Sequence, residues 1–504
     1  MSGNCFKLLL IAPLFLWGCQ KNLDKPLLGQ YSTSTFYQNG TQALQAINAA
    51  YQPLTFTSAT SNAIWVFGDV ASDDAVKGGN PGDQNDIDLI DKFNISPING
   101  NLGNEWGTLY EGITRCNMVL AKVPAIIMTD STKSRILAEA RFLRAWYYFN
   151  LVIIFGDVPV ILEPLNGDQL QITQSPVKTI YESVIEADLK LAFPALPSVY
   201  TGSDVGRATS GAAMALLAKA YLYQAKWDSS AAASTSVINS NLYQLTPLYT
   251  QNFSGFDKNN SESVFEVQMQ SGKLTPPAGN ALNQWFAPAV YGGYFFDAPT
   301  QQFVDEFEKT PAGIYDPRLD YTIGRDSMPW FNNLKFDPSW SPTGYLTRKH
   351  QQSLSVAPII GDGNCDYVAI RYADVLLWNA EALNETGQTA QALIPLNQVR
   401  KRARESYLYD TTLVAVEDTS GNRIVPPGLL PDINASNQDD IRTAIRHERR
   451  VELGFEFHRY FDVIRWGKTF ATNAMSNSPG FNYDVDKTFP IPQGERDTNK
   501  ALIF

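Results

Sequence analysis

The sequence feature that most constrains the fold is a helix–turn–helix pattern of small residues near residue 380. In "NAEALNETGQTAQALIPLNQVR" a helix, a short turn and a second helix follow one another, with tetratricopeptide-like spacing of Ala380, Leu383, Gly387, Ala392 and Leu396. Small residues at such positions let two antiparallel helices approach closely, and larger side chains fill the groove between them. The pattern therefore predicts a scaffold of packed helix pairs.

A second segment, "LAKAYLYQAKWDSSAAAS", shares this pattern through Ala218, Tyr221 and Ala225. The two copies are far apart in the sequence, so we expect a helical-repeat scaffold interrupted by insertions and not a simple solenoid. The predicted fold class is mainly α, with few short strands.

Four further segments have apolar residues at helical spacing. One of them is expected to end sharply at Gly156, where "GDVP" follows the last apolar residues. The four segments cover 39–54, 104–123, 136–155 and 179–196.

Residues 240–365 interrupt this helical pattern. Pro, Gly and Asn become frequent, and short strand-like runs such as "SVFEVQMQ" (263–270) appear. Of the 65 residues from 281 to 345, 15 are aromatic, about 23%, nearly twice the 12% of the whole chain. We therefore predict a loop-rich, aromatic-rich insertion between an N-terminal helical region (36–239) and a C-terminal one (366–504), all within one structural domain.

The N-terminus has the features of an export signal. In "FKLLLIAPLFLWGC" an apolar run too short to span a bilayer follows Lys7 and ends in Leu-Trp-Gly-Cys. This ending resembles the bacterial lipobox, so residues 1–18 are predicted to be a signal peptide and Cys19 to be lipidated, with 19–35 as a tether. The alternative is an ordinary cleaved secretory signal.

Charge and cysteine content exclude some classes of protein. The net charge is -11 and no Lys/Arg-rich run is present, so we expect no binding to nucleic acid. Apart from Cys5 and Cys19, the cysteines are Cys116 and Cys365. They could bridge in an oxidising compartment, but their spacing is neither that of a disulfide framework nor that of a zinc site, and we expect two separate buried thiols.

No sequence motif indicates catalysis, because no nucleophile elbow, P-loop or dinucleotide-binding glycine pattern is present. The charged segment 446–467 could supply the paired carboxylates of a glycosidase. Opposite charges three and four residues apart also lock a helix into a scaffold, and we predict this structural role. His447 and His458 lack a third metal ligand at suitable spacing. We expect no cofactor; the one candidate is calcium at "GDQND" and Asp88, which lack the turn Gly and terminal Glu of a calcium loop.

Three longer segments resemble the SusD/RagB family of outer-membrane lipoproteins. They are "EARFLRAWYYFNLVIIFGDVPVI" (139–161), "IRYADVLLWNAEALNETG" (370–387) and "RHERRVELGFEFHRYFDVIRWG" (446–467). "WGTLYEGITRCNMVL" and the terminal "FPIPQGERDTNKAL" are similar to the same family and come in matching order.

The resemblance implies a helical scaffold with four tetratricopeptide-like helix pairs and a loop-rich face that carries the ligand site. It also implies a partner, a SusC-like TonB-dependent outer-membrane barrel, over which such a protein acts as a lid that delivers glycan oligosaccharides. The expected location is the outer membrane, facing outside. Relatives exported to the surface often carry acidic residues after the lipidated Cys, whereas only Asp24 follows closely here.

The aromatic insertion supplies the candidate ligand contacts. Sugar rings stack their C–H faces on indole and phenol rings, while their hydroxyls need polar groups at the edges. In "YGGYFFDAP" two glycines favour a bend over a central strand. The candidate rings are Trp285, Tyr291, Tyr294, Phe295, Trp330 and Trp340, and the polar candidates are Asp73, Asp74, Asn85, Asn332, Asn333 and Arg348. For each ring taken alone, the alternative is core packing.

The function expected from these observations is non-catalytic glycan binding. One alternative is a lid of the same architecture that captures oligopeptides, as some relatives do, and the many aromatic residues argue against it. Another is a glycoside hydrolase, which would need two carboxylates facing each other across a cleft, about 5 to 10 Å apart.

Overall fold

The computed structural model describes residues 36–165, 169–274, 277–353, 355–357 and 361–503. The predicted signal peptide, Cys19 and the tether lie outside the described residues. Within the described part, the chain is mainly helical, as predicted, with ten short strands. None of the helices in those ranges combines the length and the apolar character needed to cross a membrane.

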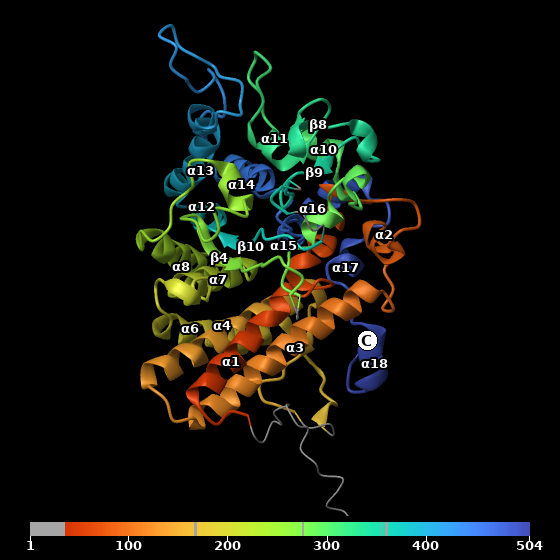
Figure 1. Ribbon diagram of the computed structural model, residues 1–504, viewed down its shortest axis with the longest axis vertical. Helices are drawn as coiled ribbons and strands as arrows, with labels where there is room; N and C mark the ends of the chain where they lie inside the picture. The colour runs from red at the N-terminus through yellow and green to blue at the C-terminus, as the bar shows by residue number, and fades with distance from the viewer. Residues whose placement is uncertain (1–35, 166–168, 275–276, 354, 358–360, 504) are drawn as a thin grey trace, which may run out of the picture.

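One end of the molecule is a bundle of long helices, drawn at the bottom of Figure 1. The bundle contains α1 (Gly40–Tyr51), α3 (Gly100–Lys122), α4 (Asp130–Phe155), α5 (Val177–Ile180) and α6 (Glu186–Ala192). The side chain of Asn39 caps α1 by accepting a hydrogen bond from the backbone N–H of Gln42. Helix α4 ends where predicted, because Gly156 adopts a φ of 75° that favours glycine.

The two predicted helix pairs lie side by side in the middle of the molecule. They are α7 (Ser210–Tyr223) with α8 (Trp227–Asn239), and α12 (Tyr372–Glu385) with α13 (Thr389–Tyr409). The amide of Asn379 on α12 donates hydrogen bonds to Ser234 Oγ (3.0 Å) and Thr235 Oγ1 (2.9 Å) on α8. Ala380 is fully buried, as its place between helices requires. Segments far apart in the sequence therefore form one continuous scaffold.

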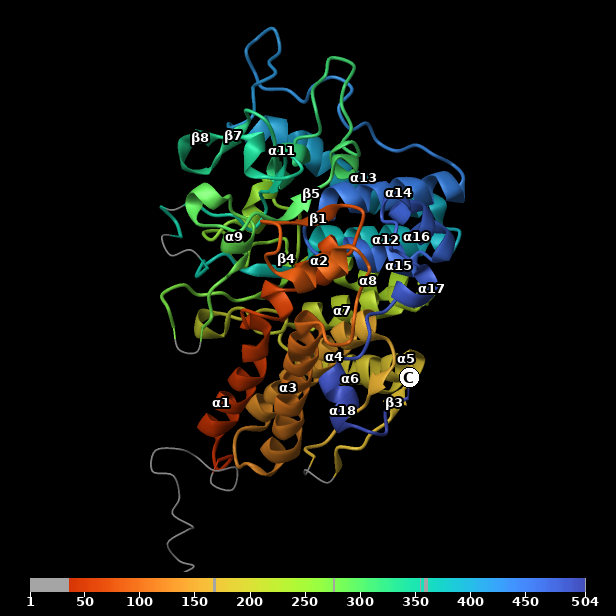
Figure 2. The ribbon, with the colours of Figure 1, turned by 90° about the vertical axis from the view of Figure 1, so that its right-hand side faces the viewer.

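Short strands connect the predicted insertion to this scaffold. β4 (Ser263–Val267) pairs antiparallel with β10 (Tyr367–Arg371), which brings the two ends of the insertion together. β1 (Ala75–Gly78) pairs with β5 (Phe296–Pro299), so a loop of the N-terminal region meets the insertion. The remaining pairs are β2 (Val158–Pro159) with β3 (Gln174–Ser175), β6 (Ile323–Gly324) with β9 (Leu346–Thr347), and β7 (Pro329–Trp330) with β8 (Leu334–Lys335). Figure 2 shows β1 and β5 adjacent beside the helical body.

The loop-rich regions also contain short helices. They are α2 (Asn85–Asp91), α9 (Leu282–Trp285), α10 (Gln301–Val304), α11 (Arg318–Thr322), α16 (Lys468–Ala474), α17 (Tyr483–Asp486) and α18 (Gln493–Thr498).

The charged segment 446–467 is not one helix, which corrects the prediction. Helix α14 (Gln438–Leu453) ends before Gly454, and five residues, 454–458, separate it from α15 (Arg459–Arg465). Phe455 and Phe457 between them adopt positive φ values of 60° and 71°. Both rings are only 1% exposed, so the burial of two phenyl groups offsets the backbone strain and breaks the helix.

The charges of this segment pair mainly with other elements and not along one helix, as the prediction assumed. Glu452, which is fully buried, accepts hydrogen bonds from Arg371 (2.6 Å), Arg318 (2.9 Å) and Arg402. Burial would raise the pKa of Glu452, but the three guanidinium groups hold it well below its usual range. Arg371 also binds Glu456 at 2.7 Å, and the pKa of that carboxyl is about 2 despite its burial.

Two further arginines extend this network into the helix pairs. Arg449 bridges Asp374 on α12 (2.6 Å) and Asp462 on α15 (2.9 Å). Arg465 binds Glu381 at 2.6 Å and Asp462 at 2.7 Å. We call the buried ion pairs made by residues 446–467 the arginine–carboxylate network. His458 lies within it, and burial lowers the pKa of its imidazole to about 4.

Replacing Glu452 by Gln should be strongly destabilising, because it leaves three buried guanidinium groups without their shared anion. The expected loss is about 3–5 kcal/mol of unfolding free energy, measured by urea denaturation. The matched control is Glu405→Gln, which affects only the more exposed pair with Lys401 at 3.8 Å and should cost less than about 1 kcal/mol. Equal losses in the two variants would contradict the role assigned to the network.

Candidate functional site

The β1–β5 pair positions the aromatic part of the candidate site. The predicted bend in "YGGYFF" is present: Gly292 has a φ of 78°, and a Cβ at Gly293 would lie 2.1 Å from the carbonyl oxygen of Ala287. Only glycine fits so close an approach. The chain then enters β5 at Phe296.

Trp285 and Tyr294 form an aromatic surface on this loop, which we call the Trp285 surface. Their ring centroids lie 5.3 Å apart, and Trp285 lies 5.9 Å from the ring of Phe296. Phe296 in turn stacks on buried Trp65. Tyr294 is 42% exposed, so this surface has a buried aromatic base and an accessible edge.

Four of the other predicted rings belong to a second group, the Trp330 cluster. Trp330 (5% exposed) and Phe336 (2%) form its buried centre, against which Tyr291, Phe295 and Trp340 pack half-buried. Tyr291 meets Trp340 edge to face, with centroids 6.0 Å apart. The buried centre gives Trp330 a packing role, whereas the half-buried rings keep accessible edges.

The predicted polar residues Asp73 and Asp74 form ion pairs with arginines. Arg459 donates to both oxygens of Asp73 (2.7 and 2.8 Å), and Arg450 donates to Asp74 at 2.7 Å. Burial would raise the pKa of Asp73, but Arg459 lowers it below its usual value; burial raises that of Asp74 to about 6. Both side chains are also buried, so neither is a proposed ligand contact.

The other predicted polar residues lie in two places. Asn85 is exposed at the start of α2, and Asn332 and Asn333 are exposed at a corner with φ near 60°. Arg348 is half-buried; it donates to the carbonyl oxygen of Asp320 (2.7 Å), and its guanidinium lies over the ring of Phe331. Asn332, Asn333 and Arg348 therefore lie beside the Trp330 cluster, whereas Asn85 lines a hollow near β1.

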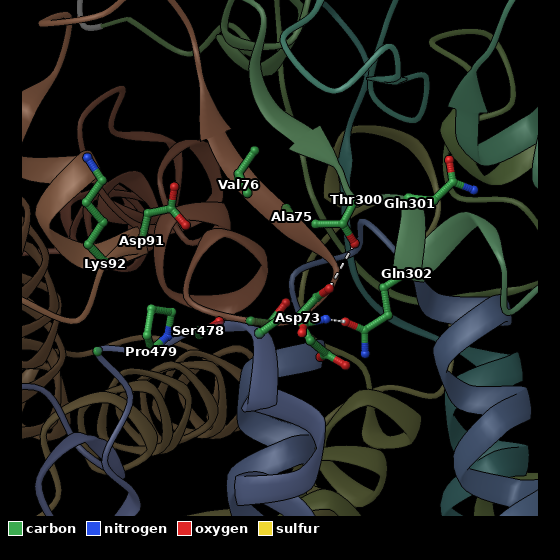
Figure 3. Close-up of a pocket in the computed structure, with 13 residues that line it drawn as sticks. Asp73, Ala75, Val76, Asp91, Lys92, Thr300, Gln301, Gln302, Ser478 and Pro479 are labelled. Carbon is green, nitrogen blue, oxygen red and sulfur yellow. Dashed lines mark hydrogen bonds between the residues drawn. The ribbon is translucent and has the colours of Figure 1, made fainter.

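A hollow of about 450 Å³ lies beside β1; of the predicted site residues only Asp73 lines it. Figure 3 shows Asp91 on one wall and Gln301 and Gln302 on the opposite wall, with Ser478 below. Asp91 accepts a hydrogen bond from the backbone N–H of Lys77 (2.9 Å), and burial raises the pKa of its carboxyl to about 6. These residues come from three distant segments, so no local sequence signal could have identified the hollow.

Two neighbouring hollows extend this depression. One of about 330 Å³ shares Val76 and Asp91 with the first, and one of about 390 Å³ shares Gln301. Tyr345 lies in the latter and donates its hydroxyl to Gln301 Oε1 at 2.7 Å. The depression offers amide and carboxyl groups, which suit a ligand rich in hydroxyl groups.

The candidate calcium segment has other partners in the structure. Asp88 binds Lys92 at 2.7 Å, and Asp86 accepts a hydrogen bond from the N–H of Gly100 at 2.7 Å. Among the residues that the structure describes, no group of three His, Cys, Asp or Glu is arranged to hold a metal ion. Cys116 and Cys365 are both buried and unbridged, which confirms two separate thiols.

Asp297, on β5 next to Phe296, is an unpaired buried acid. It is fully buried, and neither carboxylate oxygen has a hydrogen-bond partner among the described residues. Burial raises its pKa well above the usual value, and nearby Asp69 and Asp74 raise it further.

Replacing Asp297 by Asn should stabilise the protein more at pH 8 than at pH 5. Because the folded-state pKa is raised, the folded protein retains a proton that the unfolded chain has released, so stability falls as pH rises. The expected loss in the parent protein is up to about 1.4 kcal/mol per pH unit until the folded-state pKa is reached. Urea denaturation at both pH values checks this, with exposed Asp326→Asn as the control variant. An equal effect of Asp297→Asn at the two pH values would contradict it.

Replacing Tyr294 by Ala should leave the melting temperature almost unchanged, whereas Trp330→Ala should cost about 3–5 kcal/mol. The reason is their exposure, 42% against 5%. Thermal unfolding of the two variants side by side distinguishes an accessible ring from a packed one. A large loss in Tyr294→Ala would show that this ring is needed for packing.

Comparison with known proteins gives two family matches. The SusD family matches residues 261–503, and a family described as "Starch-binding associating with outer membrane" matches residues 33–222. Together they span most of the chain.

Individual relatives match over nearly their whole length. A SusD-like protein P2 of Formosa agariphila is 25% identical, covering 97% of this chain and 96% of the relative. A SusD-like protein of Bacteroides ovatus is 26% identical, covering 91% and 82%.

Solved structures confirm the mainly helical, SusD-like fold. A laminarin-binding SusD-like protein superposes with a TM-score of 0.75 at 29% identity, over 93% of this chain and 99% of the other. A SusD-like carbohydrate-binding protein of Bacteroides fragilis gives 0.77 at 25%, over 93% and 100%.

Proposed function

Because this chain belongs to the SusD/RagB family, we propose that it is a non-catalytic glycan-binding lipoprotein of the cell surface. It captures oligosaccharides or polysaccharides and acts as a lid for a SusC-like, TonB-dependent outer-membrane transporter. Cys19 carries the lipid anchor, and residues 19–35 tether the folded part to the outer membrane.

The observation that carries this proposal is the Trp285 surface. Its accessible edge at Tyr294 rests on buried rings, so a ligand finds a rigid aromatic platform that loses little entropy on binding. The depression around Asp91 and Gln301 offers hydrogen-bonding groups for sugar hydroxyls, and apolar surface beside them for the faces of the rings. The printed names of two similar solved structures, laminarin binding and carbohydrate binding, support the same ligand class.

The charge arrangement supports binding without catalysis. A glycosidase needs a general acid with a raised pKa and a second free carboxylate. The arginine–carboxylate network holds the pKa of Glu452 and Glu456 low. Asp91 lines the hollow with a raised pKa, but the second carboxylate there, Asp73, is bound by Arg459.

A glycan array with the protein starting after Cys19 tests the ligand class, with laminarin among the first glycans and a peptide library beside it. Binding to glycans without release of reducing sugar supports the proposal. Release of reducing sugar would favour a hydrolase instead. Binding to peptides alone would favour an oligopeptide lid.

Replacing Trp285 or Tyr294 by Ala should weaken glycan binding several-fold, because each removes a ring worth about 1 kcal/mol of stacking. Affinity electrophoresis with the glycan from the array measures the change. The matched control is Tyr409→Ala, an exposed tyrosine (55%) at the end of α13, outside the candidate site. Unchanged affinity in both site variants would exclude the Trp285 surface as the platform.

A further inference from the structure

A small cavity lies between the turn that carries Tyr291 and the Trp330 cluster. It has a volume of about 20 Å³, and Tyr291, Trp330, Asn283 and Gln351 are among its lining residues. Such a volume exceeds the roughly 10–15 Å³ that one water molecule requires, so the cavity has room for a single oxygen-sized group.

Two polar atoms at this cavity have no hydrogen-bond partner among the described residues. They are the hydroxyl of Tyr291 and Nε2 of Gln351, both shielded from solvent. Gln351 as a whole is only 6% exposed, and burial raises the pKa of Tyr291, so its hydroxyl keeps its proton. A buried donor without a partner costs about 1–3 kcal/mol, so these atoms favour an occupant that bonds to them.

Other polar side chains that line the cavity do form hydrogen bonds. Gln352 donates to Asn364 Oδ1 at 2.7 Å and accepts from the N–H of Asn364 at 3.2 Å. Asn283 Oδ1 accepts a hydrogen bond from the N–H of Gly361 at 3.3 Å. The lack of partners is therefore specific to Tyr291 and Gln351.

We infer that Tyr291 and Gln351 form a hydroxyl-recognition subsite for a glycan residue bound at the Trp330 cluster. The sugar hydroxyl enters the cavity, where it meets the phenol of Tyr291 and the amide N–H of Gln351. An acetamido or sulfate group is larger than the cavity, so residues substituted at that position are excluded. The subsite rests on the proposed function, and it makes the preferred ligand a glycan with an unsubstituted hydroxyl there.

Gln351→Leu and Tyr291→Phe test the subsite, because each removes the unpartnered polar atom. Tyr291→Phe keeps the ring, and Gln351→Leu replaces the whole amide group by an apolar side chain. Each variant should bind the selected glycan about tenfold more weakly, and its melting temperature should stay equal or rise because no internal hydrogen bond is lost. If both atoms bond the same sugar hydroxyl, the fold-loss of glycan affinity in the double variant should be smaller than the product of the fold-losses in the two single variants. The matched controls are Gln398→Leu and Tyr409→Phe, both exposed on α13.

The same array carries laminarin, chitin oligosaccharides with acetamido groups and a sulfated galactan. The parent protein should prefer the unsubstituted glucan, and Gln351→Leu should reduce that preference. If the parent protein binds a glycan and both variants bind it with the same affinity, the subsite is overturned and one bound water is left as the occupant of the cavity. The proposed function would not be affected. A parent protein that binds no glycan would overturn the proposed function and the subsite together.

Discussion

The buried arginine–carboxylate network is the interaction on which the rest of the structure depends. Glu452 lies between arginines from β10, α11 and α13, and Arg371 joins it to Glu456 and to Glu262 before β4. Each of these charges has lost its hydration, so any partner that moves away leaves a costly unpaired charge. The network thus fixes the relative positions of elements whose paired residues are 50 to 134 positions apart in the sequence.

The network also determines how the ligand-binding loops are held. Arg450 and Arg459 extend from the C-terminal segment to Asp74 and Asp73, which directly precede β1. Because β1 pairs with β5, the same contacts support the turn that carries the Trp285 surface. The scaffold can therefore present a rigid, ring-rich face. Asp297 on β5 remains a buried acid, and burial favours its protonated form.

The helical architecture was predictable because it depends on local periodicity: the helix pairs around residues 218 and 380 and the stop at Gly156 are present as expected. The break between α14 and α15 was not predictable, because it depends on how Phe455 and Phe457 pack in the core. Asp73 and Asp74 were chosen as polar loop residues, and only the folded chain places arginines against them. The hollow around Asp91 joins three distant segments, and single-sequence patterns contain no information on such contacts.

Hydrogen exchange of the protein with and without its bound glycan tests the central claim most directly, because it reports ligand protection along the whole chain. We expect slower exchange in residues 284–296 and 329–335, with little change in α3, α4 and the arginine–carboxylate network, which are already ordered. Protection confined to the helical bundle, with none in these loops, would contradict it and place the ligand on another face of the molecule.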